Sequence, residues 1–288
     1  MLTLKKGQAE LVLAPENGGS VSAFRCNGMD ILRPFDPAKG MNAPATEYAA
    51  FPLFPFSGRI AHGRFSFDGN EYQLPQNFPP EPHAIHGQGW QSKWEIASTT
   101  VDTTTLAFRH DGSIWPWAYH ATQIFTLTQT GLSVMLTLTN LSNRPMPAGI
   151  GWHPYFPSDD AQLICDVSAI WRSSEDMIPG ASSPLSQTSD LTSPRDVSDL
   201  NLDNAFAAGD IGNRICWPSK NISIEMTATN TLRHLIVYTP QGEDFFCVEP
   251  VSHSPDAINS SEPASVNGLK ILSPGETLSG LIYLSVED

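Results

Sequence analysis

The sequence has few positive charges and no long hydrophobic run. Its 288 residues contain 16 Lys and Arg against 30 Asp and Glu, a formal net charge of -14 at pH 7. This balance argues against nucleic acid and anionic membranes as partners, because both attract basic surfaces, and it weighs against a phosphorylated substrate. No apolar run is long enough to span a bilayer, and residues 1–13 lack the apolar segment of a signal peptide.

Cysteine is also scarce. The four cysteines stand far apart, with no C-x-x-C spacing, at Cys26, Cys165, Cys216 and Cys247. This pattern is typical of reduced thiols in a cytoplasmic protein and argues against a zinc site built on cysteines.

No long amphipathic helix is visible, whereas strands and hairpins are. Apolar and polar residues alternate from Leu132 to Thr139, and residues 129–131 join this run to a preceding strand around 124–128, which predicts a hairpin. Asn27-Gly28 and Asp68-Gly69-Asn70 predict two more hairpins. Residues 172–200, rich in Ser, Thr, Asp and Pro, are interpreted as a long surface excursion with short strands.

A single acid stands in the otherwise apolar run 245–250, Phe-Phe-Cys-Val-Glu-Pro. Strand alternation places Phe245, Cys247 and Glu249 on one face, and Pro250 is expected to stop the strand. Burying a carboxylate costs folding free energy, so a buried one is expected to have an interaction partner or a functional role. The alternative is an edge-strand glutamate that faces water.

Two histidines stand in similarly apolar surroundings. His153 lies among aromatic residues in the stretch 149–157, between two glycines and two prolines. His86, in the stretch 83–90, is followed by glycines that allow the backbone or a ligand to approach closely. With Glu249, these histidines form a candidate acid and base set over a surface suited to a sugar.

Five short strings in this order carry a family resemblance: Pro-Phe-Ser-Gly-Arg-Ile at 55–60, His-Gly at 86–87, His-Pro-Tyr-Phe at 153–156, Leu-Asp-Asn-Ala-Phe at 202–206 and Cys-Val-Glu-Pro at 247–250. Through them the chain resembles the aldose 1-epimerase (galactose mutarotase) family, in particular its bacterial branch of about this length. The resemblance implies an all-β fold, a large antiparallel β-sandwich of the galactose mutarotase-like supersandwich type. We expect one domain over residues 1–288.

The resemblance also implies roles for individual residues. Glu249 would be the base and His153 the acid that open and close the sugar ring, with His86 bonding the ring oxygen or a neighbouring hydroxyl. An ordinary Glu is ionised at neutral pH, and a nearby carboxylate can hold a His protonated, so we expect a carboxylate beside an imidazolium. Arg59 and Asp203 would bind sugar hydroxyls. No cofactor and no metal are expected.

The sequence departs from the family pattern at three places. Many members carry Asn where this chain has Gly58, and Asp or His where it has Asn204. The sequence therefore leaves undecided whether the residues at these two positions contact the sugar. The arginine that follows the first histidine in members acting on hexose 6-phosphates is missing after His86. A free sugar is therefore favoured.

Tryptophans could supply faces for a sugar ring. Trp90 and Trp152 are expected to contact the substrate, although core filling explains a lone Trp equally well. Trp115 and Trp117, on one predicted loop tip, are expected to touch either ligand or a second subunit if exposed. The oligomeric state is left open.

Each site residue has a structural alternative. His153 could be a core histidine bonded to backbone, Arg59 a structural ion pair, and Asp203 the start of a turn. His83 beside His86 invites a metal interpretation, but no convincing third ligand stands nearby. His253 and Asp256 could line the site or belong to a loop.

Three functional hypotheses remain open. The first is a cofactor-independent mutarotase acting on a free aldose, with a hexose-phosphate mutarotase as a variant. The second is a non-catalytic carbohydrate-binding or sugar-sensing protein on the same fold, which is possible in principle because a fold does not fix function. The third is a metal-assisted sugar isomerase with His83, His86, His153 and Glu249 as ligands.

Overall fold

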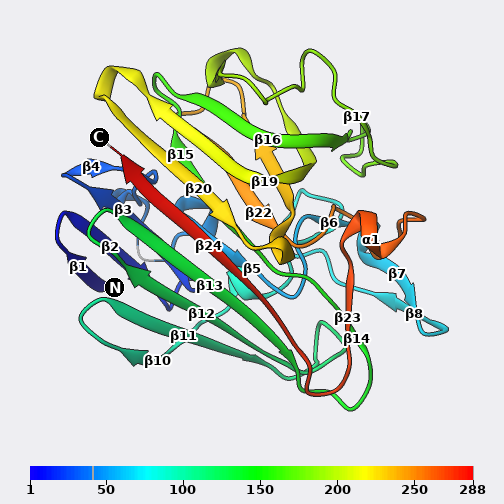
Figure 1. Ribbon diagram of the computed structural model, residues 1–288. Coiled ribbons are helices and arrows are strands. Elements are labelled where there is room, and N and C mark those ends of the chain that lie inside the picture. Colours follow the sequence, from blue (N-terminus) through cyan, green and yellow to red (C-terminus); the bar gives the residue numbers. More distant parts are fainter. Residues whose placement is uncertain (41, 288) are drawn as a thin grey trace.

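The computed structural model describes residues 1–40 and 42–287, and the chain is built almost entirely from β-strands. Most strands belong to one continuous antiparallel sheet that folds into two layers (Figure 1). The first layer contains β10 (Glu95–Thr99), β11 (Thr103–His110), β12 (Tyr119–Leu127), β13 (Gly131–Asn140), β24 (Thr277–Glu287) and β20 (Ile222–Ala228). The second contains β1 (Leu2–Lys6), β2 (Ala9–Ala14), β3 (Ser20–Cys26), β5 (Ala50–Leu53), β15 (Gly151–Pro157), β22 (Phe245–Val251) and β21 (His234–Tyr238).

Two long strands, β16 (Gln162–Trp171) and β19 (Asp203–Trp217), connect the layers. The first part of β19, Asp203–Ala207, pairs with β21 of the second layer. Its last part, Asn213–Trp217, pairs with β20 of the first layer. β16 lies beside β19 along both parts, so the sheet passes from one layer to the other through this pair. The predicted large antiparallel β-sandwich is confirmed.

Smaller elements complete the chain. The short strands are β4 (Met29–Asp30), β17 (Ser183–Pro184), β18 (Arg195–Asp196), the pair β6 (Arg59–Ile60) and β9 (Ala84–Ile85), the pair β7 (Arg64–Phe67) and β8 (Asn70–Gln73), and the pair β14 (Met146–Ala148) and β23 (Lys270–Leu272). One short helix, α1, spans Ala264–Asn267. Within residues 1–40 and 42–287, no helix has the length and apolar character needed to cross a membrane.

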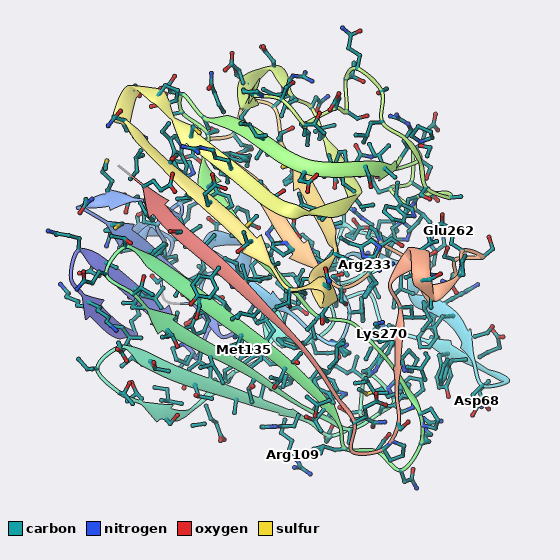
Figure 2. The ribbon with its side chains drawn as sticks, viewed as in Figure 1. Asp68, Arg109, Met135, Arg233, Glu262 and Lys270 are labelled. Atoms are coloured by element: carbon teal, nitrogen blue, oxygen red, sulfur yellow. The ribbon has the colours of Figure 1, made fainter. Side chains whose placement is uncertain are left out.

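The alternating pattern read from the sequence separates core from surface as expected. In β13 the side chains of Leu132, Val134 and Leu136 are fully buried between the layers, and Leu127 lies opposite Leu132 across the predicted hairpin. The intervening Met135 lies on the outward side of the same strand (Figure 2). The two other predicted hairpins form as well, as β3–β4 and β7–β8.

The surface excursion between β16 and β19 also follows the prediction, with β17 and β18 as its short strands. The expectation that Pro250 stops its strand is wrong, because β22 continues to Val251. A proline removes only its own N–H, and its neighbours Glu249 and Val251 keep their places opposite Ile236 and His234 of β21.

Trp115 and Trp117 do not form an exposed loop tip. Each is about 1% exposed, and both belong to the main hydrophobic core. The Trp115 ring centroid lies 5.5 Å from that of Phe56 and 5.3 Å from that of Phe65. The expectation that these tryptophans touch ligand or a second subunit is therefore wrong, because the β7–β8 hairpin closes over them.

This packing predicts the cost of truncation. Trp115→Ala should lower the free energy of unfolding by about 3 to 5 kcal/mol, because removing a buried indole leaves a cavity. The matched control is Ile114→Ala, since the neighbouring Ile114 is 44% exposed and its truncation should cost less than about 0.5 kcal/mol. Urea denaturation compares the two variants. Equal costs would contradict the burial of Trp115.

Candidate active site

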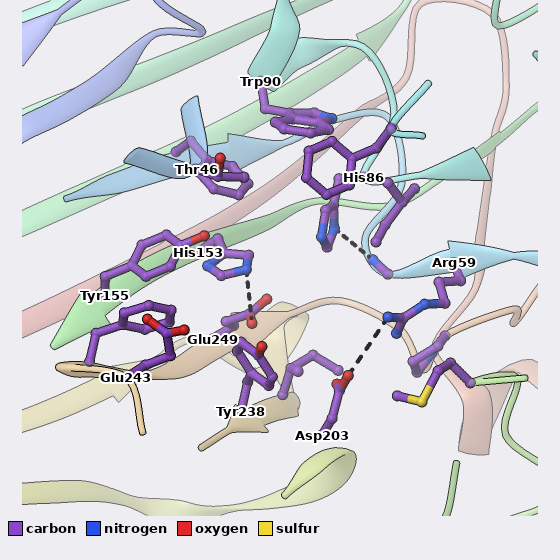
Figure 3. Close-up of a pocket in the computed structure, with 18 of the residues that line it drawn as sticks. Thr46, Arg59, His86, Trp90, His153, Tyr155, Asp203, Tyr238, Glu243 and Glu249 are labelled. Carbon is purple, nitrogen blue, oxygen red and sulfur yellow. Dashed lines mark hydrogen bonds and ion pairs between the residues drawn. The ribbon is translucent and has the colours of Figure 1, made fainter. Parts of the chain in front are cut away.

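A cavity of about 950 Å³ opens on the side of the second layer that faces away from the core (Figure 3). Strands β5, β15, β22, β21 and β19 contribute its floor, and loops around residues 33–47, 78–90 and 173–179 line its walls. Six residues of the predicted site line it together: Arg59, His86, Trp90, His153, Asp203 and Glu249. Segments from nearly the whole length of the chain therefore meet at one site.

Glu249 lies in the middle of the floor and not at a sheet edge. Its strand β22 pairs with β15 on one side and β21 on the other, and the residue is only 2% exposed. The alternative of an edge-strand glutamate facing water is therefore wrong. Phe246 and Val248 point into the main core from the opposite face of the strand, as the alternation predicted.

His153 reaches Glu249 from the adjacent strand. Its Nε2 lies 3.3 Å from Oε1 of the Glu249 carboxyl group. Within the described part of the chain, neither Nδ1 of His153 nor Oε2 of Glu249 has a hydrogen-bond partner, although both atoms are buried. His153 is therefore not a core histidine bonded to backbone, and two polar atoms of the pair remain available to a ligand.

Burial changes the expected charge state of this pair. Desolvation raises the pKa of Glu249 well above its ordinary value; the nearby Asp203 carboxyl adds to this rise and Arg59 opposes it. Desolvation likewise lowers the pKa of His153 to about 3. The structure thus favours a protonated Glu249 beside a neutral His153, where the sequence predicted a carboxylate beside an imidazolium. Both forms hold one acidic proton, and they differ only in which side of the contact carries it.

His86 is held in one tautomer by the backbone. The Gly58 N–H donates a hydrogen bond of 3.1 Å to Nδ1 of His86, so the neutral ring carries its proton on Nε2. Burial, with the neighbouring His153 and Arg59, lowers the pKa of His86 well below its ordinary value. His86 also has a φ of +61°, an uncommon conformation that tends to mark functional positions. The family-departing Gly58 thus contributes a backbone donor to the site.

Arg59 and Asp203 lie at one end of the cavity and contact each other. Nη2 of Arg59 is 3.7 Å from Oδ2 of Asp203, and Nε of Arg59 is 3.0 Å from Oε2 of Glu81. The structural ion pair considered for Arg59 therefore exists, and Glu81 is a partner that the sequence did not reveal. Burial raises the pKa of Asp203, whereas Arg59 lowers it. Asp203 begins strand β19 instead of a turn.

The two tryptophans expected at the site lie on opposite sides of the sheet. Trp90 lines the cavity, with its ring centroid 5.3 Å from that of Phe51. Trp152 is fully buried in the main core and does not line the cavity. The prediction for Trp152 is wrong because successive residues of β15 point to opposite faces, and His153 occupies the cavity face.

The proposed four-ligand metal set does not assemble. His83 is fully buried outside the cavity; its Nδ1 accepts from the N–H of His62, and its Nε2 lies 2.7 Å from the carbonyl oxygen of Asp176. His253 and Asp256 likewise bind the backbone. Nε2 of His253 accepts from the Ser57 N–H, and Oδ1 of Asp256 accepts from the Ala61 N–H. These four contacts give the residues structural roles.

Sequence reasoning assigned no role to two neighbours of the His153–Glu249 pair, Tyr155 and Cys247. Tyr155 lies two residues beyond His153 on the same strand face, with ring centroids 4.8 Å apart, so alternation could have found it. Cys247 lies two residues before Glu249 on β22, and alternation places both side chains on the same face. Its Sγ, a nitrogen of His153 and a carboxyl oxygen of Glu249 all lie within 4.8 Å of one another, the one group of three such donors within residues 1–40 and 42–287.

The hydrogen bond from Gly58 predicts the protonation state of His86. At pH 7 the ring should be neutral with its proton on Nε2, and it should gain a second proton only at a pH well below that of an ordinary histidine, because burial lowers its pKa. Nitrogen-15 NMR of labelled histidine measures this directly, and a His86→Asn variant assigns the signal. A ring protonated on both nitrogens at pH 7 would contradict the prediction.

The comparisons with known proteins agree with this architecture. The family model described as aldose 1-epimerase matches residues 1–285. The uncharacterized protein YphB of Escherichia coli K12 is 31% identical over 294 residues, which cover 99% of this chain and 98% of YphB. The uncharacterized protein YihR of the same organism is 28% identical over 222 residues, or 72% of this chain and 71% of YihR.

Solved structures show the same fold. A crystal structure from Escherichia coli K12, of a protein provisionally described as an aldose 1-epimerase, has a TM-score of 0.89 at 31% identity and covers 99% of this chain and 98% of its own. A galactose mutarotase-like protein from Clostridium acetobutylicum has a TM-score of 0.90 at 22% identity, covering 99% and 94%. The chain therefore belongs to the aldose 1-epimerase family.

Proposed function

We propose that this protein is a mutarotase that interconverts the α and β anomers of a free aldose. The observation that carries the proposal is the contact of 3.3 Å between Nε2 of His153 and Oε1 of Glu249 on the floor of a large cavity. An acid and a base in contact, each with a second polar atom unsatisfied, suit a reaction that moves one proton off the sugar and one proton onto it.

Ring opening needs a base for the proton of the anomeric hydroxyl and an acid for the ring oxygen. Glu249 can act as the base once its own proton has passed to His153 across their contact. The imidazolium of His153 then protonates the ring oxygen while Glu249 takes the hydroxyl proton. After rotation about the bond between C1 and C2, the same groups exchange roles and close the ring on its other face. No proton is gained or lost over the cycle.

The remaining cavity residues would orient the sugar. The Nε2–H of His86 is a hydrogen-bond donor that cannot supply a second acidic proton near neutral pH, so it suits the ring oxygen or an adjacent hydroxyl. Arg59 and Asp203 present a donor and an acceptor side by side, which suits a pair of neighbouring hydroxyls. Trp90 offers an apolar wall for the C–H face of the ring.

The charges around the cavity favour a neutral sugar. Its lining contains twice as many carboxyl groups (Asp36, Glu47, Asp203, Glu243, Asp244 and Glu249) as cationic side chains (Arg33, Lys39 and Arg59). Even with Glu249 protonated, five carboxyl groups remain against three cationic side chains, and a phosphate would meet this excess in addition to the overall charge of -14. A free aldose avoids that repulsion.

Replacement of Glu249 tests the proposed base. Glu249→Gln should slow anomer exchange by about 10²- to 10⁴-fold, because an amide keeps the size of the carboxyl group but cannot accept a proton near neutral pH. Sugar affinity and thermal stability should stay near those of the wild type. NMR exchange or polarimetry measures the rate above spontaneous mutarotation, over a panel of free hexoses and pentoses.

The matched control is Glu243→Gln, which alters an exposed carboxyl group at the same cavity and should leave the rate unchanged. If Glu249→Gln is as fast as the wild type, another residue is the base. If the wild type binds a sugar without accelerating exchange, the protein is a carbohydrate-binding protein on this fold and the proposal fails.

Replacement of Asp203 tests the proposed role of this residue in sugar binding. Asp203→Ala should weaken sugar affinity by about 1 to 3 kcal/mol, because it leaves a bound sugar hydroxyl without its acceptor. The fold should persist, since Arg59 keeps its contact with Glu81. Asp203→Asn is the matched control and should lose less, because the amide retains one acceptor oxygen. Unchanged affinity of the Ala variant by calorimetry would exclude Asp203 from sugar binding.

A further inference from the structure

We propose that His153, Cys247 and Glu249 form a site for a thiophilic divalent cation such as Zn²⁺, and that the bound ion inhibits anomer exchange. The inhibition rests on the proposed function, whereas binding of the ion does not. Cys247 has no part in the proposed reaction. Its Sγ nevertheless lies within 4.8 Å of the donor atoms of both other residues.

The three side chains converge because of strand geometry. Cys247 and Glu249 are two residues apart on β22 and therefore point to the same face. The register of the neighbouring β15, in which Tyr155 lies opposite Cys247 and Gly151 opposite Val251, brings His153 to the same place. Two paired central strands hold all three donors, so no loop has to become ordered when an ion binds.

A second observation points to a ligand at this place. Within the described part of the chain, Nδ1 of His153 and Oε2 of Glu249 have no hydrogen-bond partner although they are buried. Buried polar atoms without partners are rare in native proteins and are commonly explained by a missing water, ion or substrate. A sugar hydroxyl could bond either atom, and a cation could be coordinated by Oε2 of Glu249, so the two ligands would compete.

The donor set selects the kind of ion. Sulfur, imidazole nitrogen and carboxylate oxygen together suit Zn²⁺ and similar soft cations, whereas Mg²⁺ and Ca²⁺ prefer oxygen donors alone. Bond lengths of about 2.0 to 2.3 Å in tetrahedral geometry require donors roughly 3.2 to 3.7 Å apart. The three donor atoms lie within 4.8 Å of one another, so coordination would bring them closer by about 1 Å. The fourth position would face the cavity and accept water.

Charge balance also supports a doubly charged ion. Coordination replaces the thiol proton of Cys247 and the carboxyl proton of Glu249, and both protons leave to solvent. The resulting thiolate and carboxylate neutralise the two positive charges, and His153 coordinates as a neutral ring. The buried site therefore holds no net charge, which limits the cost of taking the ion out of water.

Coordination would remove both groups on which the proposed reaction depends. A metal-bound Glu249 no longer accepts the hydroxyl proton, and a metal-bound His153 has no acidic proton to give. Zinc should therefore act as a reversible inhibitor that competes with sugar, and metal-free protein should retain full activity.

Cobalt substitution tests the binding without any activity measurement. Protein treated with EDTA and then passed into metal-free buffer is titrated with Co²⁺. A thiolate-to-cobalt charge-transfer band in the near ultraviolet, with intense visible bands of a four-coordinate site, should appear at one equivalent. The charge-transfer band should be lost in Cys247→Ser and Cys247→Ala. It should persist in Cys216→Ser, a matched control whose half-buried thiol lies on β19 outside the cavity lining.

Anomer exchange is then measured against Zn²⁺. Half-inhibition should require at least about 10- to 100-fold more zinc in Cys247→Ala than in wild type, because loss of even an outer partner of a metal costs that much affinity. Both Cys247 variants should keep the metal-free rate. A wild-type spectrum without a thiolate band overturns the proposal by itself, as does equal zinc inhibition of folded Cys247→Ala. A thiolate band in a protein that shows no anomer exchange would leave the metal site standing and refute the proposed function.

Discussion

The structure depends on one costly arrangement, a carboxyl group buried in the middle of a β-sheet beside an imidazole. Glu249 is 2% exposed and lies 3.3 Å from His153. An unpaired charge at this depth would cost several kcal/mol, so the site retains its acidic proton in the absence of a ligand. The pairing of β15 with β22 holds the two side chains together, so this proton can pass only between Oε1 of Glu249 and Nε2 of His153.

Strand alternation makes that arrangement possible. Along β15 and β22, one face carries large apolar groups such as Trp152 and Phe246 into the core, and the other carries His153 and Glu249 into the cavity. A slip of one residue in either strand would exchange the two faces. The apolar packing between the layers therefore fixes the position of the His153–Glu249 pair, and the stability of the fold and the geometry of the cavity depend on the same register.

The sequence predicted much of this arrangement, and its errors have physical causes. The hairpin at residues 129–131 and the shared face of Cys247 and Glu249 were predictable, because alternation and turn residues are local signals. Trp152 was misplaced, because a strand buried on both faces lacks a polar side to orient it. Trp115 was misplaced, because its cover, the β7–β8 hairpin, comes from a distant part of the chain. The contact of Glu81 with Arg59 depends on loop closure, which no local pattern encodes. That residues 1–288 form one domain remains a prediction.

Cys247 lies close to the buried acid and base but is kept unreactive by the same burial. Its thiol lies beside both groups, yet burial raises its pKa well above the ordinary value, so near neutral pH it neither competes for the shared proton nor attacks an opened aldehyde. The low polarity that keeps Glu249 protonated also keeps this thiol inert. A positively charged ligand would lower the pKa of both groups, because it stabilises the thiolate and the carboxylate together. The same burial therefore underlies both proposals, a neutral sugar as substrate and a soft cation as its competitor.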